Sequence, residues 1–166
     1  EVPLGTPFKD LLAMAGGVWK GRQLKAVIPG GSSMPVLPAE TMLNVNMDYD
    51  SVMKAGSMLG SGAVVVMDET TCMVKACWRI AKFYAHESCG QCTPCREGTG
   101  WMLSILDRMV KGQAVVADLD RLLSVANGIE GRTICAFGEA AAWPMQGFLR
   151  HFRSEFERYI IKDGRE

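Results

Sequence analysis

Three cysteines lie within seven residues of this 166-residue sequence, and they are the side chains best suited to chemistry. Cys89, Cys92 and Cys95 have the spacing C-x2-C-x2-C, and Cys135 follows after two helix-length segments. One loop with this spacing can present three thiolates to a [4Fe–4S] cluster, and a remote residue usually supplies the fourth. The spacing therefore favours an iron–sulfur cluster ligated by these four cysteines, and with it electron transfer.

Four cysteines can also hold a structural zinc ion. Zinc sites usually combine two separated pairs of ligands, whereas three of the ligands here would come from one loop. A zinc-stabilised domain whose helices dock partners stays open as the alternative hypothesis. Cys72 and Cys77 lie five residues apart in a predicted helix and do not share one face well, so we expect ordinary thiols there.

The residues around the three cysteines suit an anionic centre. Gly90 removes a side chain where loop amides approach sulfur, and Pro94 stiffens the loop. A helix that begins near Arg96 would direct its partly positive N-terminus at the loop. Arg96 either adds positive charge there or pairs with Glu97, and both interpretations stay open. We interpret His86 as an ordinary histidine at a helix end.

Composition limits the class of protein. Apolar residues make up 48% and charged residues 22%, as in soluble globular proteins. The 18 basic and 18 acidic residues cancel, so no electrostatic surface for nucleic acid is expected. The longest apolar run, 62–67, is too short to cross a bilayer, and we expect membrane association only through partners. Without a secretory signal, a reducing compartment suits the six cysteines.

The first part of the chain, residues 1–69, is predicted to be a small α+β domain. A helix capped by Thr6 carries an apolar face, strands are expected at 25–28 and 63–67, and Asp50 caps a short helix over 51–55. The glycines at 60 and 62 are not a dinucleotide fingerprint, because they precede a strand instead of following one.

The second part, residues 70–166, is predicted to be a four-helix bundle. The first helix begins near Thr70, and the second carries Trp101 on its apolar side. Asp118 is expected to cap the third helix, and Pro144 to kink or restart the fourth. The mixed charges over 150–162 indicate a solvated helix face that a partner can contact.

Five segments together carry a resemblance to one family. They resemble the C-terminal part of the NADH-binding, FMN-carrying subunit of respiratory complex I, which is the F-type subunit of NADH:quinone oxidoreductase. The resemblance covers nearly the whole chain. Its segments are Glu87–Gly98, Thr133–Gly138, Ala141–Pro144, Ala26–Ser33 and Val65–Asp68.

The resemblance implies a partial β-grasp domain of the soluble-ligand-binding type over 1–69, then a four-helix bundle over 70–166 that carries a [4Fe–4S] cluster. It implies that Cys89, Cys92, Cys95 and Cys135 ligate the cluster, which takes electrons from FMN and passes them along an iron–sulfur chain toward quinone. FMN and NADH would be bound by an N-terminal domain that this sequence lacks. We therefore expect no catalytic residue and no FMN or NAD contact here, and no NADH turnover by this segment alone.

The implied partners are other iron–sulfur subunits of the NADH dehydrogenase module. The implied location is peripheral, on the cytoplasmic side of a bacterial inner membrane or the matrix side in mitochondria. The same module occurs in NAD-reducing hydrogenases and NAD-linked formate dehydrogenases. Those enzymes are the alternative within the resemblance.

Overall fold

A computed structural model describes residues 1–160, in which the chain divides into two compact units with the boundary between Thr71 and Cys72. The first unit holds a small sheet with short helices, and the second holds four long helices. This confirms the mixed helix-and-sheet class predicted from the sequence. The predicted bundle residues 161–166, including Lys162, lie outside the described residues.

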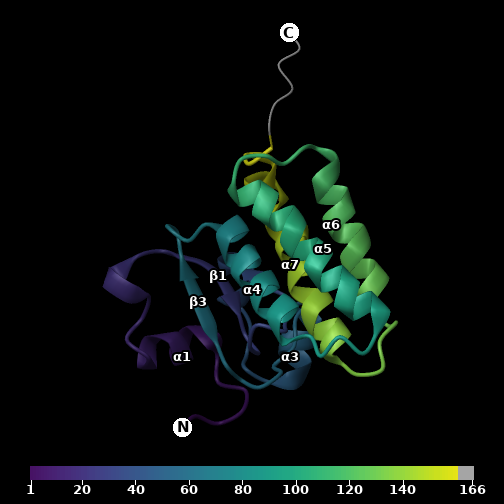
Figure 1. Cartoon of the computed structure of the whole chain (residues 1–166). Coiled ribbons are helices and arrows are strands. Elements are labelled where there is room, and N and C mark those ends of the chain that lie inside the picture. The colour runs from purple at the N-terminus through teal and green to yellow at the C-terminus, as the bar shows by residue number, and fades with distance from the viewer. Residues whose placement is uncertain (161–166) are drawn as a thin grey trace. The chain divides into compact units, whose positions relative to one another are not determined.

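The first unit is built on a three-stranded antiparallel sheet in the order β2-β1-β3. Figure 1 labels its two longer strands, β1 and β3. Its strands are β1 (Leu24–Ile28), β2 (Leu37–Pro38) and β3 (Val65–Asp68). Val27 pairs with Leu37 on one side and Val66 on the other. The short helices are α1 (Phe8–Met14), the 3-10 turn η1 (Trp19–Gly21), α2 (Ala39–Met42) and α3 (Tyr49–Lys54).

Apolar side chains from sheet and helices form one core in this unit, and it includes Phe8, Val27, Leu37, Met42 and Val52. These residues are almost completely buried, and removing that apolar surface from water stabilises the unit.

The predicted caps of the first unit are wrong in two places. Asp48, and not Asp50, caps α3, because its carboxylate accepts hydrogen bonds from the Ser51 amide at 2.7 Å and the Ser51 hydroxyl at 2.9 Å. The helix begins at Tyr49, two residues before the predicted start, so Asp50 falls inside its first turn. The Thr6 hydroxyl does not cap α1 and donates to the Pro3 carbonyl at 2.7 Å.

The glycine-rich turns of this unit pack against each other. The Ser61 amide donates to the Gly30 carbonyl at 3.1 Å, and the Gly31 amide donates to the Ala63 carbonyl at 2.7 Å. A Cβ on Gly30 would lie 2.6 Å from the Leu59 carbonyl carbon, so the two backbones approach too closely for a side chain. Backbone packing therefore explains these glycines.

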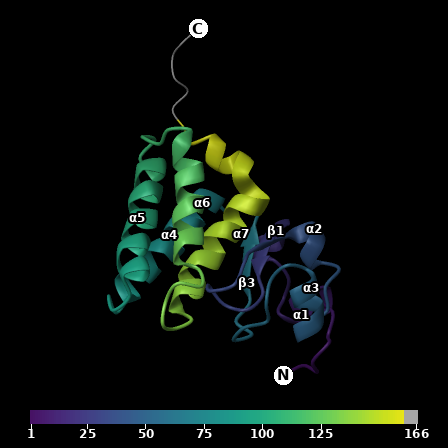
Figure 2. The same cartoon turned by 90° about the vertical axis from the view of Figure 1, so that its right-hand side faces the viewer.

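The second unit consists of four helices that lie side by side, as Figures 1 and 2 both show. They are α4 (Met73–Glu87), α5 (Thr93–Val110), α6 (Ala117–Ile129) and α7 (Phe137–Glu157). Helices α4 and α6 each pack against both α5 and α7. The α4–α5 and α6–α7 connections lie at one end of the four helices (Figure 1). This arrangement brings two segments that are far apart in sequence to the same end.

Amphipathic spacing explains this packing, since each helix buries apolar residues three or four positions apart. No helix within residues 1–160 combines the length and apolarity that a membrane span requires. The buried positions include Val74, Cys77 and Ala81 in α4, Met102, Leu106 and Met109 in α5, Leu119, Leu122 and Ala126 in α6, and Ala141, Met145 and Phe148 in α7.

Three predictions for the second unit need correction. Trp101 is 59% exposed, although its spacing predicts a place on the core face of its helix. Pro144 does not restart the last helix, which continues through it, and the residue with non-helical angles inside this helix is Phe152. Asp118 is not the N-cap of α6, because it lies one residue inside that helix and Val116 takes the cap position.

Asp118 holds the connection between α5 and α6. Its carboxylate is buried and accepts hydrogen bonds from Arg108 at 2.7 Å, from Arg121 at 3.1 Å and from the Val115 amide at 3.1 Å. Burial raises the pKa of Asp118, but these hydrogen bonds outweigh it, so the pKa lies below its ordinary value of 3.8. The ionised carboxylate is therefore the form that stabilises the fold.

We predict that Asp118→Asn lowers the free energy of unfolding at pH 7 by about 2 kcal/mol, because hydrogen bonds to a charged group are lost. Since the pKa is lower in the folded state, this contribution is present above about pH 4 and declines as the pH falls further. The gap between wild type and variant should thus narrow in urea titrations run at pH 3.

Asp120→Asn is the matched control, because Asp120 lies in the same helix and is 74% exposed in its ion pair with Arg153. Its free energy of unfolding should stay close to that of the wild type. Equal losses in the two variants would contradict the structural role of Asp118.

Candidate metal centre

The connection between α4 and α5 holds three of the predicted ligands in different local settings. Cys89 lies in the loop, Cys92 takes the N-cap position of α5, and Cys95 lies in the first turn of that helix. Gly90 between them has φ +76°, a conformation that side chains rarely adopt, which explains the glycine. The helix N-terminus supplies unpaired amides and partial positive charge beside Cys92.

The three thiols also differ in access to solvent. Cys95 is buried, with 7% of its surface exposed, whereas Cys92 is half-buried and Cys89 is exposed. Exposure thus increases from Cys95 inside the first turn of α5, through Cys92 at its N-cap, to Cys89 in the loop.

The fourth predicted ligand, Cys135, lies in the connection between α6 and α7. The Thr133 hydroxyl donates to the Cys135 carbonyl at 2.8 Å, and the Thr133 side chain packs against Gly138 at the start of α7. A Cβ on Gly138 would meet the Thr133 hydroxyl and lie 2.8 Å from its methyl group. Absence of a side chain at Gly138 thus lets this loop fold onto α7. The Cys135 side chain itself is exposed.

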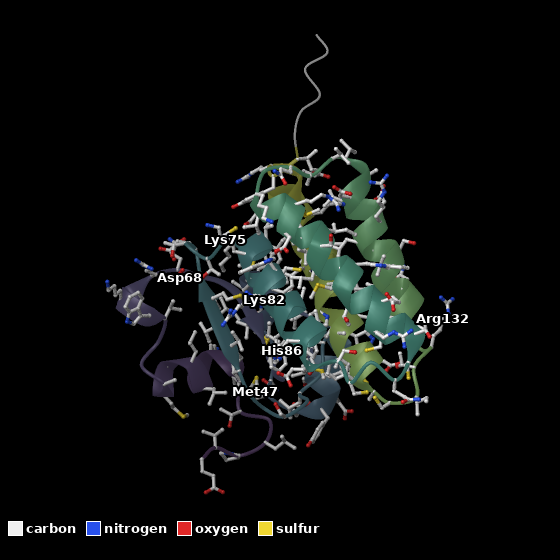
Figure 3. All side chains as sticks on the ribbon, in the orientation of Figure 1. Met47, Asp68, Lys75, Lys82, His86 and Arg132 are labelled. Carbon is white, nitrogen blue, oxygen red and sulfur yellow. The ribbon has the colours of Figure 1, made fainter. Side chains whose placement is uncertain are left out.

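The two connections meet at one hydrogen bond. The Ile134 amide donates to the Cys92 sulfur at 3.3 Å, which joins positions 42 residues apart. In Figure 3, His86 near the end of α4 and Arg132 just after α6 mark the same end of the four helices. The structure therefore places the neighbour of Cys135 directly against one cysteine of the triplet.

The four sulfur atoms are not gathered into one coordination shell. Within residues 1–160, no three histidine, cysteine, aspartate or glutamate side chains are grouped so that they could hold a metal ion. The six cysteines form no disulfide, so each can lose its proton and act as a thiolate ligand. The donor set fits an iron–sulfur cluster, because four cysteines lie in or directly beside two adjoining connections, with the Ile134 amide and the Ser88 hydroxyl next to sulfur.

The remaining two cysteines lie within the packing of the four helices. The Cys77 sulfur is buried 3.3 Å from the Met145 sulfur, and burial raises the pKa of this thiol. The Cys72 sulfur lies 3.2 Å from the Tyr159 hydroxyl. Each of these two sulfur atoms therefore contacts a residue from the end of the chain that forms or follows α7.

The ion pair with Glu97, one of the two interpretations given for Arg96, is present in the structure. The Nε atom of Arg96 lies 2.9 Å from a Glu97 carboxylate oxygen, and its Nη1 donates to the Gly90 carbonyl at 3.0 Å. The Arg96 guanidinium therefore forms an ion pair with Glu97 and also holds the backbone of the cysteine loop at Gly90. His86 is 84% exposed and lies 3.0 Å from Glu87, as expected for a helix-end histidine.

Sequence reasoning missed two residues that contact sulfur. The Ile134 amide and the Ser88 hydroxyl lie next to cysteines in the chain but contact the sulfurs of more distant ones, Cys92 and Cys95. Ser88 sits at the C-terminal end of a helix, a position that suggests capping. Only the fold shows which sulfur each residue contacts.

The packing of Gly138 against Thr133 predicts the effect of adding one methyl group. Gly138→Ala should lower the free energy of unfolding by about 1–3 kcal/mol, because the new Cβ overpacks this contact. Gly100→Ala in α5 is the matched control, since a Cβ there meets open space and should stabilise the helix by roughly 0.5–1 kcal/mol. Thermal and urea unfolding give both values, and the same sign for the two variants would contradict the close approach at Gly138.

Curated relatives match nearly the whole chain. The F subunit of NADH-quinone oxidoreductase from Rickettsia bellii (strain OSU 85-389) is 54% identical over 162 residues, which cover 96% of this chain and 39% of that protein. The F 1 subunit of the same enzyme in Rhizobium meliloti (strain 1021) is 52% identical over 162 residues, covering 96% and 37%. The chain therefore spans about two fifths of the length of these relatives.

A solved structure resembles the fold. The crystal structure of an NAD+-reducing [NiFe]-hydrogenase in the H2-reduced state has a TM-score of 0.86 and 29% sequence identity, over 98% of this chain and 27% of that one. The family described as the NADH-ubiquinone oxidoreductase-F iron-sulfur binding region matches residues 75–159, a range that includes both loops and the four cysteines. The chain belongs to this family, as its resemblance to the FMN-carrying subunit predicted.

Proposed function

We propose that Cys89, Cys92, Cys95 and Cys135 ligate one [4Fe–4S] cluster through which the protein transfers electrons. The observation that carries the proposal is the contact between the two cysteine loops, the Ile134 amide on the Cys92 sulfur, in a chain of the iron–sulfur binding family. When bound, such a cluster accepts and releases one electron at a time. Cys89 and Cys135, which are exposed, must turn toward the centre to complete the ligand set.

The surrounding residues favour an anionic group. The N-terminus of the 18-residue helix α5 lies at the loop and contributes partial positive charge. Arg96 donates to the Gly90 carbonyl, and its charge is balanced by the ion pair with Glu97. The partial charge of the helix and the donors to sulfur lower the free energy of the negatively charged centre, and they favour its reduced form.

The finer fold assignment belongs to this proposal. Residues 1–69 form a partial β-grasp domain of the soluble-ligand-binding type, and residues 70–166 form a four-helix bundle that carries the cluster. The small sheet with its short helices supports the first part, and the mutual packing of α4, α5, α6 and α7 supports the second. Likeness to the hydrogenase structure over 98% of the chain also supports this assignment.

In the whole protein, this module belongs to the NADH-oxidising subunit of an NADH:quinone oxidoreductase. FMN and NADH are bound by a preceding domain, and electrons pass from FMN through the cluster toward quinone. Its partners are other iron–sulfur subunits of the same module, at the cytoplasmic side of the membrane. The identity of 54% to the Rickettsia bellii protein over almost the entire chain supports this assignment. This segment alone does not turn over NADH.

The second candidate is the corresponding module of an NAD+-reducing hydrogenase. The TM-score of 0.86 to such an enzyme favours this second candidate, since nearly the whole fold of the chain is found in that enzyme. Sequence identity separates the two, at 29% to the hydrogenase chain against 54% to the quinone-reductase relative. Subunits that copurify with the protein decide between the two: quinone-reductase subunits support the first and a nickel–iron subunit the second.

We predict about four iron atoms per chain after anaerobic iron–sulfur loading, with an electron paramagnetic resonance signal after dithionite reduction. Cys135→Ser should abolish or convert the cluster, because one iron loses its thiolate. Cys72→Ser is the control and should keep the iron content, since Cys72 contacts Tyr159. Stoichiometric zinc without iron uptake would rule out the electron-transfer proposal.

A further inference from the structure

Ser88 links the two helices that flank the cysteine loop. Its amide donates to the Tyr84 carbonyl at 3.1 Å, which ties it to the end of α4. Its hydroxyl oxygen lies 3.2 Å from the sulfur of Cys95, in the first turn of α5. Ser88 is thus tied to the end of α4 and Cys95, which is 7% exposed, lies inside α5, so the contact joins two positions that the helices fix.

The direction of this hydrogen bond follows from its neighbours. The Gly90 amide donates to the Ser88 oxygen at 3.4 Å and so occupies a lone pair of the hydroxyl. A thiolate that ligates iron carries no proton and can only accept. With Cys95 as an iron ligand, the Ser88 hydroxyl therefore donates to the Cys95 sulfur, and the amide, hydroxyl and sulfur form a chain in which each hydrogen bond polarises the next.

Such a donor acts on the charge of its sulfur. Reduction adds negative charge to the cluster and its ligands, and a hydrogen bond to sulfur stabilises that charge more in the reduced state. We propose that Ser88 is a positioning residue that raises the reduction potential of the site through its hydrogen bond to Cys95. This inference rests on the cluster ligation proposed above.

The test is an anaerobic redox titration of the loaded chain, followed by electron paramagnetic resonance. In Ser88→Ala, the ratio of reduced to oxidised cluster at a fixed potential should fall about tenfold, a shift of about 59 mV to lower potential for one electron. Ser88→Thr keeps the hydroxyl and should retain the wild-type midpoint. Ser154→Ala, at an exposed position in α7, is the control and should leave the midpoint unchanged.

An isosteric pair makes the test independent of folding or loading. Ser88→Thr and Ser88→Val differ by a hydroxyl in place of a methyl group, and the titration reads only the loaded fraction of each. The valine variant should have the lower potential. It should also lose an exchangeable proton coupling, measured by electron–nuclear double resonance in H2O and D2O, that the threonine variant retains.

The outcomes separate this inference from the proposed function. A wild-type chain that binds no iron overturns the cluster proposal, and the role of Ser88 with it. A loaded wild type whose midpoint and proton coupling match those of Ser88→Val overturns the role of Ser88 alone. A lower potential in both the alanine and valine variants, with rescue by threonine, supports it.

Discussion

The hydrogen bond from the Ile134 amide to the Cys92 sulfur is the contact on which the candidate site depends, because it joins two loops 42 residues apart. It exists only because α5 and α6 together lead the chain away from that end of the helices and back again. The ligand set thus requires two complete helices to form between its third and fourth members. A cluster bound there would cross-link the fold across the same distance, which couples metal binding to stability.

The two ends of the four helices are held by different interactions. At the far end, the buried carboxylate of Asp118 gathers two arginines and an amide around the α5–α6 connection. At the cysteine end, the absence of a side chain at Gly138 lets Thr133 pack closely on α7, the Ile134 amide donates to the Cys92 sulfur, and the Ser88 hydroxyl lies against the Cys95 sulfur. A buried charge cluster therefore secures the α5–α6 connection, whereas close backbone packing and contacts to sulfur join the two connections at the cysteine end.

Local patterns in the sequence predicted the four long helices well and singled out the four cysteines that the proposal makes ligands. Periodicity depends on neighbouring residues, and C-x2-C-x2-C spacing is itself local. The wrong predictions concern residues whose position depends on contacts with residues that are distant in the sequence. Arginine partners made Asp118 a buried anchor instead of a cap, and Trp101 points out of the core although its spacing matches the apolar face. Asp48 was missed because a shift of two residues in a helix start moves its cap.

Residues that contact sulfur could not be found in this way. Ser88 precedes Cys89 in the chain but lies against Cys95, and Ile134 precedes Cys135 but lies against Cys92. The sequence shows adjacency along the chain, whereas the fold determines adjacency in space. Spacing therefore gives a proposed ligand set, but it does not give the hydrogen bonds around that set.

The four thiols differ in solvent exposure, so one side of the site is buried and the other is open to solvent. Cys95 is held inside the first turn of α5, while Cys89 and Cys135 face solvent from loops. The two helix-associated thiols are therefore already fixed in place before any cluster is bound, while the two loop thiols have freedom to adjust. Loading of the site would then reorganise the loops around Cys89 and Cys135 and leave the start of α5 unchanged.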